Sequence, residues 1–298
     1  MDFNELIKNG WARHDKHTGE VSAELEAHAG LADDPGKAVQ LITLAVHMMG
    51  GHAGEWARAA ALADRVVKAL AESAELAPAL GNLAVARFMA GDYAGALAAE
   101  SDAARLTDGQ PVSVMARTRV LIASALVDAR RLDEAVRVYE AAVALAKSRD
   151  DKLACDRAIA VTSNNLASEF LGRENLPDAE KALMLSAAIN AREFWLKCGT
   201  WENEERAEYL LACVYNKLGK PQQALEHSER GLEVIAANGE EVVDEAFLNL
   251  TQANSCRLLG NREGYDRAIQ RADELAAEWT DQGLKDWYAE DRAKVAWQ

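Results

Sequence analysis

Proline is scarce in this sequence, with five prolines among 298 residues. Because proline interrupts the interior of helices and strands, its scarcity permits long uninterrupted elements. Strand-like alternation is almost absent, whereas alanine and leucine abound and apolar residues recur at positions i, i+3, i+4 and i+7. The sequence therefore predicts an all-α protein.

Basic residues are outnumbered: 33 lysines and arginines stand against 48 aspartates and glutamates, for a formal net charge of −15. This balance argues against a nucleic-acid partner held through phosphate contacts. The sequence has no run of 18 apolar residues that would span a membrane, and its first residues lack the apolar core of a signal peptide. We therefore expect a cytoplasmic protein with no nucleic-acid partner and no membrane association.

Paired cysteines are also missing. The four cysteines occur singly within apolar helical patterns, and no CxxC pair is present. Small buried thiols in a reducing compartment explain this arrangement, and a disulfide framework is not expected.

The sequence contains a repeated segment whose pattern predicts a helix, a break and a second helix. Its copies are residues 81–106, 120–145, 164–189, 209–234 and 249–275. A small residue recurs at equivalent places, because two helices that cross 8–10 Å apart leave no room for a large side chain. The first such position is Ala84, Ala123, Ala167, Ala212 and Ala253; the second is Ala96, Ala135, Ala179 and Ala224, with Tyr265 in the last copy; the third is Ala103, Ala142, Ser186, Gly231 and Ala272.

These segments resemble the tetratricopeptide repeat, in which small residues occupy the same positions in the two helices around a short turn. The spacing of 39 to 45 residues between the first small positions exceeds the usual 34, so the repeats are longer than consensus and degenerate. The consensus tryptophan and the closing proline are missing. The resemblance implies a right-handed α-α superhelix of about seven helical hairpins plus a C-terminal capping helix.

We expect residues 1–75 to form degenerate N-terminal hairpins, residues 76–282 the repeats and residues 283–298 the capping helix. No Gly/Ser-rich or Pro-rich linker divides the chain. We therefore predict one continuous solenoid.

In the tetratricopeptide family the first helix of each pair lines a concave groove, which binds a protein or peptide segment. Transferring the groove positions to this sequence predicts a binding surface of Arg117, Asn164, Arg206, Tyr209, Asn216, Lys217, Asn254 and Arg257. Arginine and asparagine at such positions suit a peptide with an acidic group. The same residues would alternatively form an ordinary solvated face, or bind a small molecule.

Five of the six histidines precede residue 53, and His14 and His17 share one helix face next to Asp15. Exposed or helix-capping histidines are one interpretation, and a transition-metal site is the other. The signatures HExxH and CxxC are absent, and the glycines of 48–56 lack the GK[ST] ending of a phosphate-binding loop.

No catalytic motif is present, so we predict a non-catalytic binding scaffold without a cofactor. One alternative is a ligand-responsive regulatory sensor of the same repeat class, and another is a metal-dependent activity in the histidine-rich region. The late tryptophans Trp195, Trp201, Trp279, Trp287 and Trp297 should pack the long helices, and an exposed pair would mark a homo-oligomer or partner surface.

Overall fold

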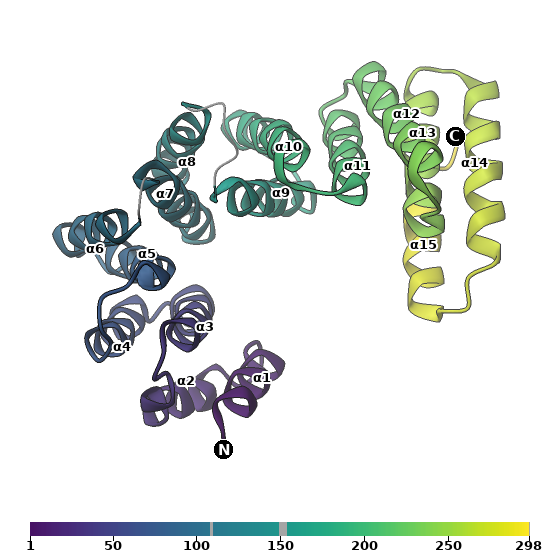
Figure 1. The fold of residues 1–298 in the computed structure, drawn as a ribbon. Helices are drawn as coiled ribbons and strands as arrows, with labels where there is room; N and C mark the ends of the chain where they lie inside the picture. Colours follow the sequence, from purple (N-terminus) through teal and green to yellow (C-terminus); the bar gives the residue numbers. More distant parts are fainter. Residues whose placement is uncertain (108–109, 149–153, 298) are drawn as a thin grey trace. The chain divides into compact units, whose positions relative to one another are not determined.

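The fold is all-helical, as predicted. The computed structural model describes residues 1–107, 110–148 and 154–297, and within these ranges the regular structure consists of helices (Figure 1). The α-helices are α1 (Phe3–Arg13), α2 (Thr18–Ala27), α3 (Pro35–Ala45), α4 (Trp56–Lys68), α5 (Ala77–Met89), α6 (Tyr93–Leu106), α7 (Pro111–Asp128), α8 (Leu132–Lys147), α9 (Asp156–Leu171), α10 (Asp178–Cys198), α11 (Trp201–Lys217), α12 (Pro221–Asn238), α13 (Val242–Leu258), α14 (Arg262–Ala277) and α15 (Gln282–Lys294). Three short helices join them: η1 (Ala29–Leu31), η2 (Val46–His52) and η3 (Ala74–Leu76).

The described helices form consecutive pairs from α1/α2 to α13/α14, followed by α15, which agrees with the expected hairpins and terminal helix. None of the described helices combines the length and apolarity that a membrane crossing needs. None of the four cysteines forms a disulfide.

Four of the pairs turn in the same way. Only residues 90–92, 129–131, 218–220 and 259–261 separate their two helices. The middle residue of each turn has a positive φ, and the residue after it donates a backbone hydrogen bond to the carbonyl five positions earlier, which closes the end of the first helix. Those middle residues are Gly91, Arg130, Gly219 and Gly260, with φ of 86°, 60°, 68° and 71°.

The small residues lie where helices touch. Ala84, Ala123, Ala167, Ala212 and Ala253 are all buried. A Cβ added at Gly231 on α12 would lie 2.8 Å from Leu248 Cδ2 on α13, so the glycine allows a close crossing that a larger residue would permit only if Leu248 shifted. Ala179 differs from its prediction, because it is exposed. The α9–α10 connection is six residues long (172–177), and α10 begins in another register.

The chain divides into two compact units, Met1–Ala158 and Ile159–Gln298, which we call unit 1 and unit 2. The regions expected to meet at 75/76 and 282/283, and their union in a single continuous solenoid, stay predictions. In unit 1 the first helices touch in sequence, α1 with α3, α3 with α5 and α5 with α7. In unit 2, α11 touches α13, and α13 touches α15. Each unit therefore presents a wall of first helices.

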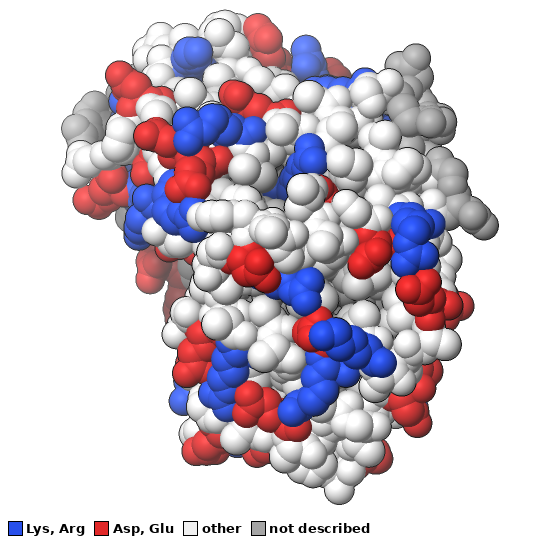
Figure 2. All heavy atoms as spheres, turned by 90° about the vertical axis from the view of Figure 1, so that its left-hand side faces the viewer, with Lys and Arg blue, Asp and Glu red and all other residues white. Residues whose placement is uncertain are grey.

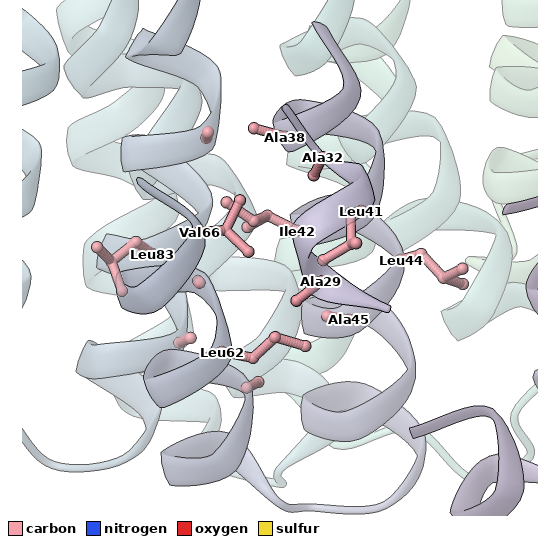
Figure 3. Close-up of a cluster of buried hydrophobic side chains, with 14 of the residues drawn as sticks. Ala29, Ala32, Ala38, Leu41, Ile42, Leu44, Ala45, Leu62, Val66 and Leu83 are labelled. Carbon is pink, nitrogen blue, oxygen red and sulfur yellow. The ribbon is translucent and has the colours of Figure 1, made fainter. Parts of the chain in front are cut away.

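Aliphatic side chains fill the core of unit 1 between α3, α4 and α5, where Ile42, Val66 and Leu83 are buried (Figure 3). The core at the end of unit 2 is more aromatic, with Phe247, Trp279 and Tyr288 packed between α13, α14 and α15. These cores hold the walls of first helices in place.

Candidate functional site: two cavities on the first helices

The wall of first helices in unit 2 contains a cavity of about 420 Å³, here called the C-terminal cavity. Side chains from α11, α13 and α15 line it, with Leu171 at the end of α9. Five of the eight residues predicted for the groove lie here: Tyr209, Asn216, Lys217, Asn254 and Arg257. The remaining lining is Cys213, Phe247, Leu250, Thr251, Leu258, Asp291, Lys294 and Val295.

Two of these five polar side chains are engaged in packing the helices. Asn216 is buried, donates to the carbonyl oxygen of Thr251 at 3.1 Å and accepts a hydrogen bond from Ser255 Oγ at 3.1 Å. Lys217 Nζ donates to the carbonyl oxygens of Leu171 and Arg173 at 2.9 and 2.7 Å. Both side chains therefore join neighbouring helices, although they border the cavity.

Arg257 is differently placed. Its Nη2 donates to Asn254 Oδ1 at 2.7 Å, but its buried Nε has no hydrogen-bond partner. It forms no ion pair with any residue in the described part of the chain. Most described arginines form an ion pair with a carboxylate. In one example, Arg58 Nη2 lies 2.7 Å from Glu26 Oε2. The alternation of blue and red side chains in Figure 2 reflects this pairing on one face of the molecule.

Tyr209 supplies a second donor in the C-terminal cavity. The electrostatic influence of Cys213 and burial of the ring both raise the pKa of Tyr209. The hydroxyl therefore stays protonated at neutral pH and can donate a hydrogen bond.

Three predicted residues lie outside this cavity. Arg206 is exposed; its Nε lies 2.8 Å from Asp244 Oδ2 and its Nη2 lies 3.7 Å from Glu241 Oε1. Its positive charge is therefore already compensated by these carboxylates. Asn164 is half-buried on α9 and does not line the cavity. Arg117 belongs to unit 1.

A second cavity, here called the N-terminal cavity, lies on the first helices of unit 1 and has a volume of about 260 Å³. Arg117 lines it; burial lowers the pKa of Arg117, and its Nη1 lies 3.4 Å from Asn82 Oδ1. Two tryptophans, Trp11 on α1 and Trp56 on α4, complete an apolar lining. The sequence indicated neither tryptophan as a lining residue, because residues 1–75 contain no clear repeat to which Trp11 and Trp56 could be aligned.

Three of the six histidines gather at the edge of the N-terminal cavity. His14 lies with His47 and His52, and their ligand atoms fall within 4.8 Å of one another. His17, the expected neighbour of His14, instead has its Nδ1 3.5 Å from Glu20 Oε1. The sequence could not indicate His47 and His52 as a pair, because residues five apart on an α-helix point about 140° away from each other.

Comparison with known proteins gives one family match. Residues 116–149, from within α7 to just beyond α8, match the family model "Tetratricopeptide repeat". Two similar solved structures are BtubC (BKLC) from P. vanneervenii, at 16% identity and a TM-score of 0.46, covering 83% of this chain and 94% of that chain, and the apo form of the quorum sensor NprR from B. thuringiensis, at 12% identity and a TM-score of 0.33, covering 92% and 87%. No curated protein matches the sequence.

Proposed function

We propose, from the premise that this chain is a tetratricopeptide-repeat protein, that it is a non-catalytic scaffold which binds a peptide segment carrying an acidic group. The binding site is the C-terminal cavity. The observation that carries the proposal is Arg257, a guanidinium group on the wall of this cavity with an unpartnered buried Nε and no ion pair among the described residues.

The charge of the protein makes an arginine without an ion pair informative. With a net charge of −15, carboxylates are in excess over arginines and lysines. A buried donor without an acceptor costs about 1–3 kcal/mol. A ligand carboxylate or carbonyl group that reaches Arg257 would remove this cost and add a charge-assisted hydrogen bond.

The neighbouring side chains suit an extended peptide. Tyr209 and Asn254 offer hydrogen-bonding groups, and Asn254 already orients the guanidinium. Phe247, Leu250 and Leu258 provide an apolar surface beside them. Polar groups that fix orientation, together with an apolar surface that buries area, are the usual composition of a ligand site.

The test is binding to an array of short peptides in which each Asp- or Glu-containing sequence is paired with its Asn or Gln counterpart. We expect the wild-type protein to prefer a subset of the acidic members. Arg257→Glu should lose at least about 2 kcal/mol of binding free energy, or about thirtyfold in affinity.

Arg267→Glu is the matched control, because Arg267 is exposed on α14 and pairs with Glu263 of its own helix. It makes the same charge change away from the cavity, and binding should persist. Acidic peptides that bind Arg257→Glu as well as wild type, or an array with no acidic preference, would refute the proposal.

A further inference from the structure

Three potential metal ligands, His14, His47 and His52, converge beside the N-terminal cavity, and the carboxylate of Asp15 lies next to two of them. His47 Nε2 lies 3.1 Å from His52 Nε2. Asp15 Oδ1 lies 2.9 Å from His14 Nε2 and 3.8 Å from His52 Nε2. These four residues come from the end of α1 and from η2, so the fold brings them together from two separate segments.

The helix η2 is a π-helix, and this explains how His47 and His52 come to face the same way. In a π-helix the hydrogen bonds join residues five apart, so a side chain returns to nearly the same side after five residues. Gly50 lets the ring of Trp56 pack directly against η2, because a Cβ there would lie 2.3 Å from ring carbons of Trp56. Single π-helical turns occur frequently at functional sites.

The hydrogen bonding of His14 suits a metal ligand. Its Nδ1 lies 2.6 Å from the carbonyl oxygen of Trp11, and since a carbonyl oxygen only accepts, Nδ1 carries the proton. In the neutral ring Nε2 then presents a lone pair toward the carboxylate of Asp15. That contact is repulsive unless the ring is charged or a cation lies between the two groups. A backbone carbonyl that fixes the tautomer is also the usual second partner of a metal-binding histidine.

We propose that His14, His47 and His52 bind a Zn²⁺-class transition-metal ion through their Nε2 atoms, with Asp15 Oδ1 as the fourth ligand. Zn–N distances of 2.0–2.1 Å place the ligand atoms of a tetrahedral ion about 3.3 Å apart. Three of the six separations among these atoms are 2.9, 3.1 and 3.8 Å, and the ligand atoms of the three histidines lie within 4.8 Å of one another, so binding would draw the side chains slightly closer together. Three imidazoles and one carboxylate favour zinc, copper or nickel over magnesium or calcium, which prefer oxygen ligands.

The bound ion would join the end of α1 to η2. His47 also lines the N-terminal cavity, and its ring centroid lies 5.2 Å from that of Trp11. The metal would therefore fix one wall of this cavity. The metal site lies in unit 1 and uses none of the residues of the C-terminal cavity. Zinc binding and peptide binding can therefore be tested independently of each other.

The test is calorimetric titration of ZnCl₂ into untagged, EDTA-treated full-length protein, with MgCl₂ as the negative control. We expect one Zn²⁺ per chain and no Mg²⁺ binding. His52→Ala should weaken zinc binding at least about tenfold, and Asp15→Asn should weaken it too. Both side chains are exposed, so these variants are expected to fold, which circular dichroism verifies.

The matched control is His17→Ala, which removes a nearby histidine outside the cluster and should bind zinc like the wild type. In a second readout, Co²⁺ should give the visible absorption of a tetrahedral site in wild type and His17→Ala only. Zinc that binds His52→Ala and His17→Ala equally well, or no stoichiometric uptake by the wild type, would overturn the proposal.

Discussion

At the scale of single residues, Glu205 on α11 is an unusual carboxyl group because its side chain is completely buried. Neither of its oxygens has a well-formed hydrogen bond to a described residue. Burial, reinforced by the neighbouring Asp244, raises the pKa of Glu205 to about 9. Arg206, the nearest cation, makes its shorter contact with Asp244. In the folded protein Glu205 is therefore protonated at neutral pH.

We predict that Glu205→Gln stabilises the protein in a pH-dependent way. Between the unfolded pKa of about 4.5 and the folded pKa of about 9, the folded state retains a proton that the unfolded state has lost, so stability falls as the pH rises through this window. Glutamine stays neutral in both states, so the variant should gain about 1–3 kcal/mol at pH 8 and little near pH 5. Urea unfolding at the two pH values measures this, with Glu204→Gln as the control. A variant less stable than wild type at pH 8 would contradict it.

At the scale of elements, the contacts at helix ends decide what Lys217 does. The last carbonyl groups of an α-helix have no partner within the helix, and a cation is favourable there. Lys217 at the end of α11 supplies that cation to α9, through the carbonyl oxygens of Leu171 and Arg173. A residue that the groove alignment places on the binding surface therefore also joins two successive first helices.

We predict that Lys217→Met lowers the free energy of unfolding by about 0.5–1 kcal/mol, because the end of α9 loses its cation. Peptide binding at the C-terminal cavity should be much less affected than by Arg257→Glu. Thermal unfolding and the peptide array measure the two effects, and Lys220→Met, at an exposed position, is the control. A variant of unchanged stability that loses peptide binding would show that Lys217 is a ligand-binding residue instead.

At the scale of the whole molecule, helix pairs contact mainly their neighbours, so stability is expected to be local. The helix α15 covers the aromatic end of unit 2. Its Tyr288 hydroxyl donates to Asp273 Oδ1 at 2.7 Å, and the ring packs edge-on against Trp279 at a centroid distance of 5.5 Å. This end depends on α15 in a way that unit 1 does not.

We predict that Tyr288→Ala destabilises unit 2 by about 3 kcal/mol, because it removes a buried ring and leaves Asp273 with one donor fewer. Hydrogen exchange should accelerate in α13 and α14 while the amides of α3 to α5 keep their protection. Tyr93→Ala is the control, since that ring is exposed on α6. Equal loss of protection in both units would contradict local stability.

The repeat architecture follows largely from local sequence. Helical periodicity predicts the helices, and small residues such as Ala123 and Ala212 predict where they touch, because only small side chains permit a close crossing. Three of the four tight turns carry a glycine where φ is positive, so they too are visible in the sequence; Arg130 is the exception. Ala179 was misplaced because its register depends on the length of the preceding connection.

By itself, then, the sequence determined the class of fold and which helices form the walls of first helices, since both depend on contacts between neighbouring segments. Only the tertiary structure decided which polar groups on those walls are available. Carboxylates at the start of α13 compensate Arg206, whereas Arg257 forms no ion pair with a described residue. Likewise a π-helix, which the α-helical period cannot indicate, unites His47 and His52 with His14. Charge pairing and ligand convergence depend on distances between side chains of different elements, and those distances exist only in the folded chain.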